Sequence, residues 1–550
     1  MDKNKLPSLP EGKTAADIYK ALSKTREGVL REAQRLSEIT IPSVFPPDGT
    51  EPADVLGTQN QGINASAINS LTSALQYAGF PPNLPFVKYN ITQTALEASQ
   101  KVKDDPKLIS LIKGAVVKRA NAHRVRAAST PLRGTYSEYT KQLLIGGNAC
   151  FDYTEIDTPV VHRMDKYVVL RDDKGRQLLV IVEKMVLRKD LPEEVLQDLE
   201  ATQGLLSEPG APQKDSEKAW YEDSVKVHRV CMTDENNYKT YHLWEEVDGI
   251  IIEDTRETWK GGVKPLHAAW LIPSFGSNWG RSYAQEYRGD HFFVENLGSA
   301  VQDMAAALAL TLITVIPGGM TKTKDVKEAR NLDVISGRLE DIGAVQFGKS
   351  GDLSAVAGLL SDAERRLGRA YLSTFSIQRD AERVTKAEWM ALQRELEKAM
   401  GTIYAFIGTE VLLPVVMQFI KLHDEEENSD FLDRFSKLIN VGVVTGADSL
   451  GQDIDTDNLR EYRAELNELM TPQIAATKVD DDEVAKRLAV GRNIPTEGLL
   501  KDPERQAQES ESQKQDALMQ QAAPGMMQDG AKALMQGMMA QQQQPAPEQP

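Results

Sequence analysis

Cysteine is nearly absent from this sequence, since Cys150 and Cys231 are the two thiols among 550 residues. So few cysteines encode no disulfide framework and no thiolate metal cluster. Isolated cysteines are typical of proteins that work in a reducing compartment. The first residues are polar and lack the apolar core of a signal peptide. Together these features predict synthesis and assembly in the cytoplasm.

Long hydrophobic runs are also lacking. The longest is Met304–Ile316, which is shorter than the roughly 20 residues that span a bilayer. We therefore expect this run to be a helix buried against protein, and we expect no membrane partner.

Positive charge is in deficit, because 64 Lys and Arg residues stand against 81 Asp and Glu residues, for a net charge of −17. A protein that grips duplex DNA neutralises many phosphates with basic side chains. The charge balance therefore argues against extensive DNA wrapping. It is compatible with a wall past which DNA slides, because like charges repel within about a Debye length, ~8–10 Å.

Aromatic residues are sparse at 6%, but the chain is 41% hydrophobic and 26% charged, which is globular composition at a length that allows several domains. Apolar residues recur at helical spacing in the first part of the chain, which predicts helices over 14–38, 65–77 and 107–145. From 148 to 272 the pattern changes to short β-branched runs flanked by turn residues. This stretch predicts an antiparallel β region with a helical insert near 191–206.

The second half of the chain is mainly helical in pattern. Apolar steps from Tyr283 onward predict one helix of about 30 residues, stopped by Pro317, and a compact, turn-rich segment follows. A clean apolar stripe predicts a second long helix over 354–376. After a polar link, the capping box of Thr385 and Glu388 predicts a third helix that ends at Pro414.

The strongest enzyme-like motif is Gly343–Ser350, which satisfies the Walker A pattern of a phosphate-binding loop. Its context differs from that of such a loop, since no apolar strand precedes it and no apolar run ending in Asp follows. We therefore interpret it as a short strand that turns into the next helix. The pattern leaves a nucleotide-binding motor subunit as an alternative function.

Other candidate sites are weaker. Asp453–Asp457 resembles the start of a calcium loop, but Asn458 and Ala464 occupy the positions where that loop needs Gly and Glu. The seven histidines form no HxxxH or HExxH pair, and no GxSxG motif occurs. The sequence therefore predicts no catalytic residue, no metal site and no cofactor, and we expect a protein that is not an enzyme.

Two local sequences resemble one family. The first comprises Ile39–Gly49 and Gly62–Ala74, and the second comprises Arg379–Glu388 and Glu395–Gly401. Both resemble the portal proteins, or head-to-tail connectors, of short-tailed (podovirus-type) bacteriophages, over about residues 15 to 500. The resemblance implies a homo-oligomeric, usually dodecameric ring at one capsid vertex, through which DNA is packaged and later ejected.

The same resemblance implies an α+β, mainly helical fold in which a wing domain with an antiparallel β region flanks a stem of two long helices. It implies these parts: wing 1–280 with the β region 148–272, stem helices 281–313 and 354–376, a small α/β clip 314–353, a tunnel loop 377–385, a wing helix and return segment 386–469, and a helical crown 470–515. Residues 516–550 are rich in Gln, Ala, Met and Pro and are expected to be disordered.

By this resemblance, Arg379, Arg383 and Lys386 would face DNA in the tunnel loop. The interface between neighbouring stems would include Val301, Leu308, Leu312, Leu359 and Leu367. Expected partners are further copies of the chain, double-stranded DNA, the terminase packaging motor, tail adaptor proteins, and the major capsid and scaffolding proteins. The expected location is the portal vertex of the virion. A helical scaffold protein is a second alternative, favoured by the long helices alone.

Overall fold

The computed structural model describes much of the chain, namely residues 9, 12–51, 54–81, 86–91, 106–206, 223–309, 312–329, 334–345, 350–372, 396, 398–427, 439–443, 462–466, 468–469 and 484. The chain divides into two compact units. The first unit comprises Met1–Asp105 and Arg119–Gln452, and the second comprises Pro106–Lys118 and Asp453–Pro550. Most of the expected crown (470–515) and all of the tail (516–550) lie outside the described residues.

Helices predicted near the N-terminus are confirmed. Helix α1 (Ala15–Ile39) begins at a capping box in which Thr14 and Asp17 satisfy each other's amides. Helix α2 (Ile63–Gly79) carries the predicted apolar face. The segment predicted as mainly helical forms α5 (Pro106–Ser129) and α6 (Leu132–Gly146), separated at Pro131, whose ring cannot continue a helix.

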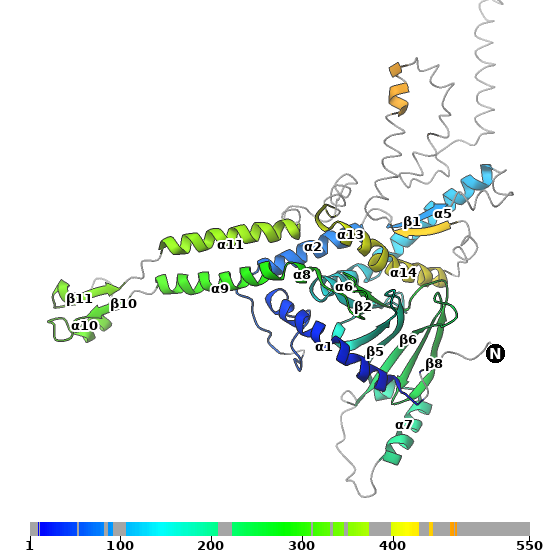
Figure 1. Ribbon diagram of the computed structural model, residues 1–550, viewed down its shortest axis with the longest axis horizontal. Coiled ribbons are helices and arrows are strands. Elements are labelled where there is room, and N and C mark those ends of the chain that lie inside the picture. The colour runs from blue at the N-terminus through cyan, green and yellow to red at the C-terminus, as the bar shows by residue number, and fades with distance from the viewer. Residues whose placement is uncertain are drawn as a thin grey trace, which may run out of the picture. The chain divides into compact units, whose positions relative to one another are not determined.

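The predicted β region is confirmed as two antiparallel sheets (Figure 1). The larger has the strand order β4-β5-β6-β7-β8 and the smaller the order β3-β2-β9. Their bounds are β2 Asn148–Asp152, β3 Val160–His162, β4 Tyr167–Arg171, β5 Gln177–Leu187, β6 Ser224–Thr233, β7 Tyr241–Val247, β8 Ile250–Trp259 and β9 Leu266–Trp270. The predicted insert is helix α7 (Glu193–Leu206), between β5 and β6 in sequence. The chain therefore has a mixed fold of helices and antiparallel sheets.

Two apolar clusters hold helices against the larger sheet. Ala15 and Tyr19 of α1 are buried with Ile181 and Trp244 of the sheet. Val195 and Leu199 of α7 are buried in a second cluster with Val227, Val247 and Ile252. Burial of each large apolar side chain contributes roughly 1.5–3 kcal/mol, so the helices and the sheet stabilise each other.

The single long helix predicted from Tyr283 is wrong in its bounds. The structure has a short helix α8 (Tyr283–Glu286), then α9 (Arg288–Ala309), and the helix ends before the predicted residue 313. Leu312, counted as a helical residue in the prediction, begins strand β10 (Leu312–Val315), which pairs antiparallel with β11 (Ile342–Val345). Ile313, Thr314 and Val315 are β-branched and favour a strand.

The second predicted long helix is α11 (Ser350–Ala370), which begins and ends earlier than the predicted 354–376. Helix α10 (Thr323–Glu328) lies between β10 and β11 in sequence.

The helix predicted to end at Pro414 does not end there. Helix α13 (Thr402–Phe406) passes through a π-helical turn, Ile407–Leu412, into α14 (Leu413–Glu426). Pro414 lies in the first turn of α14, where a missing amide N–H costs little. The whole segment is apolar enough to cross a membrane by length and composition. Val415, Val416, Phe419 and Ile420 are nevertheless buried within the protein, so it is a core helix.

Candidate functional site

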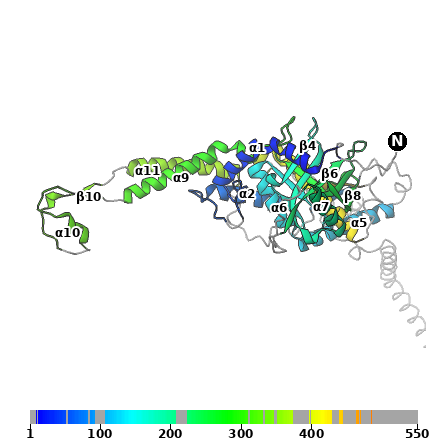
Figure 2. The ribbon, with the colours of Figure 1, turned by 90° about the horizontal axis from the view of Figure 1, so that it is seen from below.

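Helices α9 and α11 form a hairpin, which we call the stem. They lie side by side in both views (Figures 1 and 2) and run antiparallel, since the segment 312–345 joins their ends. Near the base of the stem, Arg366 of α11 forms an ion pair of 2.9 Å with Asp290 of α9. Ala363 and Leu367 are fully buried there, so the base is packed within one chain.

The distal half of the stem is covered much less. Leu359 is 54% exposed although it lies on the apolar stripe of α11. Val356, Leu360 and Val301 are half-buried. A helix pair with apolar side chains left in water gains free energy when a further surface covers them.

The predicted interface residues fall into three groups. Val301 and Leu359 lie in the described, partly exposed half of the stem. Leu367 is buried inside the single chain, so its contacts lie within one subunit. Leu308 lies on α9 and Leu312 on β10, and the placement of their side chains lies outside the described part of the structure.

A buried polar cluster, which we call the stem hub, fixes the base of the stem. Nδ1 of His291 lies 2.9 Å from Oδ1 of Asn64, and Nε2 lies 2.7 Å from the hydroxyl of Tyr371. The amide nitrogen of Asn64 donates to the carbonyls of Ile39 and His291. Oδ1 of Asn64 therefore accepts from Nδ1–H of His291, and Nε2 accepts from the Tyr371 hydroxyl.

Burial governs the charge of the stem hub. Burial lowers the pKa of His291 to about 4, against the opposing effect of the Asp290 charge. Burial likewise raises the pKa of Tyr371 well above its ordinary value. Both groups are therefore neutral at physiological pH, and the hub is a chain of neutral hydrogen bonds that joins α2, α9 and the end of α11.

The stem hub lies directly before the predicted tunnel loop. Leu372 is buried and has a φ of 55°, a backbone region that non-glycine residues rarely adopt. The next residues, including the predicted DNA-facing Arg379, Arg383 and Lys386, lie outside the described part of the structure. Leu396, where the description resumes, is fully buried. Buried residues, Leu372 and Leu396, therefore lie at both ends of the stretch 373–395, in which the tunnel loop is predicted.

The clip was expected over 314–353, but β10 begins at Leu312 and α11 at Ser350. From here on, the clip means the small module at the far end of the stem formed by residues 312–329 and 334–345. Its centre is Asp341, whose Oδ2 accepts hydrogen bonds from the amide and the hydroxyl of Thr321, both 3.1 Å long. The Thr321 hydroxyl also accepts from the amide of Arg338. These bonds tie the segment around Thr321 to the segment that leads into β11, and so hold the described part of the clip together.

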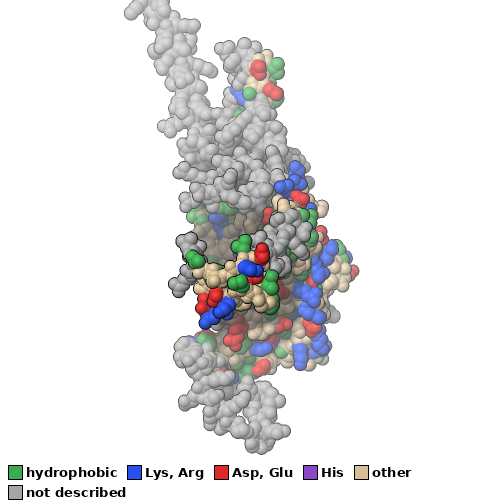
Figure 3. Space-filling view, turned by 90° about the vertical axis from the view of Figure 1, so that its left-hand side faces the viewer, with side chains coloured by type: hydrophobic (Ala, Val, Ile, Leu, Met, Phe, Trp, Pro, Cys, Tyr) green, Lys and Arg blue, Asp and Glu red, His purple; other side chains and the backbone are tan. Residues whose placement is uncertain are grey.

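The clip exposes large apolar side chains. Val334 is 100% exposed and Leu339 is 93% exposed, and Ile316 and Met320 are also exposed. Figure 3 looks from the clip end and shows hydrophobic side chains between acidic and basic ones on the face nearest the viewer. Exposed apolar groups of this kind mark surfaces that contact other proteins.

The Walker-like run does not adopt the arrangement of a phosphate-binding loop in its described part. Gly343–Val345 lie in β11, opposite Leu312–Thr314 of β10, in a two-stranded antiparallel sheet. The hydroxyl of Thr314 donates to the carbonyl of Gly343. A Walker A loop instead leaves its first glycine free to turn around a phosphate after a strand of a parallel sheet. Residues 346–349 lie outside the described part, and Ser350 begins α11.

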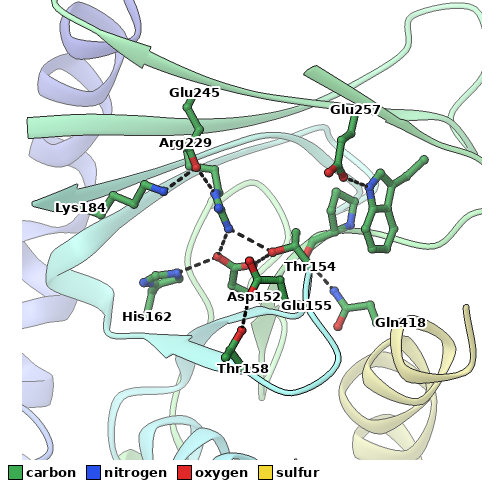
Figure 4. Close-up of polar contacts among 12 residues, drawn as sticks. Asp152, Thr154, Glu155, Thr158, His162, Lys184, Arg229, Glu245, Glu257 and Gln418 are labelled. Atoms are coloured by element: carbon green, nitrogen blue, oxygen red, sulfur yellow. Dashed lines mark hydrogen bonds and ion pairs between the residues drawn. The ribbon is translucent and has the colours of Figure 1, made fainter. Parts of the chain in front are cut away.

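An ion network joins the two sheets (Figure 4). Arg229 on β6 lies between two carboxylates, 2.8 Å from Asp152 on β2 and 2.8 Å from Glu245 on β7. His162 also contacts Asp152, at 3.2 Å, and Lys184 contacts Glu245. Burial opposes ionisation of Asp152, but the hydrogen bond with His162 and the charge of Arg229 outweigh it and lower the pKa of this carboxyl. The network is structural, since other side chains satisfy its charges.

Neither thiol is suited to chemistry. Cys150 and Cys231 are free and buried, and burial raises the pKa of Cys231 to about 12. The reactive form of cysteine is the thiolate, so both are inert at neutral pH. Among the described residues, no group of three or more His, Cys, Asp or Glu side chains is arranged to hold a metal ion.

Comparison with known proteins identifies the family. Residues 12–500 match the family described as bacteriophage head to tail connecting protein. The chain belongs to this family. It is 29% identical over 540 residues to the portal protein of Escherichia phage T7, covering 96% of this chain and 94% of that protein. It is 28% identical to the portal protein of Enterobacteria phage T3, covering 94% of this chain and 92% of that protein.

The chain also has a weak likeness to solved structures. One described as the neck of an empty GTA particle computed with C6 symmetry overlaps 84% of this chain and 93% of its own, with a TM-score of 0.34 and 10% identity. The sequence relatives carry the family assignment, and the resemblance to portal proteins inferred from the sequence is confirmed.

Two buried polar clusters, the stem hub and the ion network, have no counterpart in the sequence pattern. The stem hub depends on a single histidine, and the ion network depends on charges in strands that are distant in sequence. The spacing of apolar residues predicts neither the stem hub nor the ion network, because both depend on contacts between residues that are distant in sequence. One signal was present: Glu245 and Glu246 interrupt the apolar pattern of β7 and are nonetheless buried, and buried carboxylates require partners.

Proposed function

We propose that this chain is the subunit of a homo-oligomeric, dodecameric portal ring at one capsid vertex, and that the ring is the channel for DNA packaging and ejection. The observation that carries the proposal is the stem, whose distal apolar side chains, led by Leu359 at 54% exposure, lack cover within the single chain. A closed ring supplies that cover with the same surface of each neighbour. Family membership supports the same arrangement.

Electron microscopy of the purified protein tests the proposal. We expect rings with a central hole, because the uncovered stem needs neighbours on both sides and cyclic symmetry supplies them. Native mass spectrometry would give the number of subunits. A population of monomers or rods at micromolar concentration would contradict the ring and favour a scaffold protein.

The clip is the surface that we propose for the terminase packaging motor and the tail adaptor proteins. Its exposed Val334 and Leu339 offer apolar anchors on a module held together by Asp341, and interfaces use such anchors. The wing is proposed to contact the major capsid and scaffolding proteins. Assembly is proposed in the host cytoplasm, with the finished ring in the virion.

The tunnel loop is proposed to contact passing DNA through Arg379 and Arg383, with Lys386 at its end. An arginine adds a transient, salt-dependent contact to phosphate. Replacing both arginines (Arg379→Ala with Arg383→Ala) is expected to leave rings and procapsids intact and to reduce DNA packaging or retention severalfold. The measurement is the amount of DNA protected from nuclease per procapsid.

A matched variant controls for a general loss of charge. Arg365 lies on the exposed face of α11 and pairs weakly with Asp362 at 3.6 Å, so Arg365→Ala is expected to package normally. Normal packaging by the double variant would show that these two arginines do not act on DNA, and the ring assignment would stand.

A further inference from the structure

A pocket in the β-rich part of the first unit is not used by the ring function. Its volume is about 360 Å³, within the range of small-molecule sites. The turn between β4 and β5, strand β9 and the helical segment around Phe406 and Glu410 form its walls. This pocket lies away from the stem and clip in sequence and belongs to neither.

The pocket is basic although the chain is acidic overall. Four cationic side chains line it. Arg176 pairs with Asp172, whereas Arg171, Lys174 and Lys264 have no ion pair with any carboxylate in the described part of the chain. Glu410 is the acidic residue among the lining residues, and its side chain is exposed. Lys174 is exposed, but Arg171 and Lys264 are half-buried. Like charges in a half-buried site repel each other, and a bound anion would offset that repulsion.

Arg171 is held in place with hydrogen-bonding capacity to spare. Its guanidinium donates to three backbone carbonyls, those of Asn278, Gly175 and Ala268. A guanidinium has five N–H donors, so two remain for a ligand. The group also stacks over the ring of Trp270, 4.1 Å from its centroid. Burial lowers the pKa of Arg171 to about 10, which leaves the side chain charged at neutral pH.

Lys264 supplies a second fixed cation. Burial lowers its pKa, while the charge of Glu410 acts in the opposite direction and that of Arg171 in the same direction. Within the described residues, its ammonium group makes no hydrogen bond and no ion pair. An anion bound between Lys264 and Arg171 would therefore satisfy donors that the protein itself leaves free.

Aromatic rings complete the pocket. Phe275 is 72% exposed and packs edge-on against Trp270, with ring centroids 6.2 Å apart. Tyr238 is 48% exposed, and Arg176 stacks over its ring at 4.1 Å. Exposed aromatic rings that are held in place by neighbouring side chains can stack on a planar base. Unpaired cations beside them can bind the phosphate of the same nucleotide.

We propose that this pocket binds a nucleoside phosphate, with the phosphate between Arg171 and Lys264 and the base against Phe275 or Tyr238. The three unpaired cations and the single carboxylate of Glu410 leave an excess of two positive charges in the pocket. A phosphate monoester carries close to two negative charges at neutral pH, so its charge would balance that excess. A free mononucleotide and the nucleotide at the end of a DNA strand present the same chemistry, and the experiment below separates them.

Isothermal titration calorimetry on the assembled protein tests the site. The probes are dAMP, deoxyadenosine, inorganic phosphate, sulfate and a short single-stranded oligonucleotide with a 5′ phosphate. We expect dAMP to bind at least about tenfold more tightly than deoxyadenosine or phosphate, because base and phosphate each contribute. Tighter binding of the oligonucleotide than of dAMP would identify a DNA strand end, and the reverse would identify a free nucleotide.

Two variants and a control locate the site. Lys264→Met keeps the aliphatic stem and removes the charge, and should weaken dAMP binding by about tenfold or more. Phe275→Ala changes an exposed ring, and should lower the preference for dAMP over phosphate. Lys260→Met, an exposed lysine four positions from Lys264 that does not line the pocket, should bind as the native chain does.

Three results would overturn the proposal. The first is no heat of binding with any nucleotide at millimolar concentration in correctly assembled protein. The second is dAMP binding that Lys264→Met leaves unchanged. The third is sulfate or phosphate binding as tightly as dAMP, which would reduce the pocket to an anion site without recognition of a base. None of these results bears on whether the chain forms rings.

Discussion

We expect rings to be lost when Leu359 is replaced by aspartate, while the single chain keeps its fold. Leu359 is 54% exposed within one chain, so the new carboxylate stays in water in the monomer. In the proposed ring it would be buried against a neighbour without a partner, which costs several kcal/mol at each interface. Each 1.4 kcal/mol is tenfold in an association constant, so we expect ring formation to weaken at least ~100-fold, measured by native mass spectrometry.

Two comparison variants make the result specific. Leu359→Met conserves volume and apolarity and should still form rings. Leu367→Ala, at a site buried within the chain, should instead lower the free energy of unfolding by about 2–5 kcal/mol, seen as a lower melting temperature of the monomer. Intact rings from Leu359→Asp would remove this face of α11 from the interface.

The second large effect is expected at the ion network. Arg229→Met leaves Asp152 and Glu245 facing each other with their shared cation removed. Breaking a buried ion pair by removing one partner costs about 3–5 kcal/mol, and we expect that loss in the free energy of unfolding. Lys226→Met on the same strand is the control, because its pair with Glu183 is 61% exposed on the lysine side and should contribute at most about 1 kcal/mol.

The same variant should change the response to acid. The pKa of Asp152 is lowered in the folded chain, so the unfolded state binds a proton more readily than the folded state does. The stability that Asp152 contributes is therefore present above its ordinary value of 3.8 and is lost as pH falls through the lower folded pKa. Removing Arg229 raises the folded pKa, so acid unfolding should begin at a higher pH. An unchanged acid transition would show that Arg229 does not stabilise the ionised carboxyl.

The sequence predicted those elements whose signals are local. The helical apolar spacing over 14–38 corresponds to α1, and the β-branched runs around Val180 and Val230 are central strands. Where tertiary contacts decide the secondary structure, the prediction from the sequence was wrong. Leu312 continues the apolar spacing of α9 but pairs with Val345 in a sheet, and spacing alone cannot distinguish a helix end from a short strand.

The features of the candidate site also divide into those with a local sequence signal and those that depend on tertiary contacts. The apolar stripe of α11 was visible in the sequence, and the exposure of Leu359 was not, because exposure depends on how far α9 covers that stripe. Pro414 has the form of a helix stop, yet the π-helical turn before it places it in the first turn of α14, where it is tolerated. The basic pocket joins Arg171, at the end of β4, to Lys264, between β8 and β9, although they are 93 residues apart in sequence. No local sequence pattern reports such a pair.

The stem hub has a mechanical consequence. Helix α11 has 21 residues and is about 31 Å long at a rise of 1.5 Å per residue, with the clip at one end and Tyr371 at the other. The 2.7 Å bond between Tyr371 and His291 ties that second end to α9, and Asn64 ties His291 to α2. We therefore expect a force that tilts the clip to turn both stem helices together about the stem hub, instead of sliding one helix past the other. The chain that continues from Leu372 starts at the hub, so we expect the start of the predicted tunnel loop to move less than the clip does.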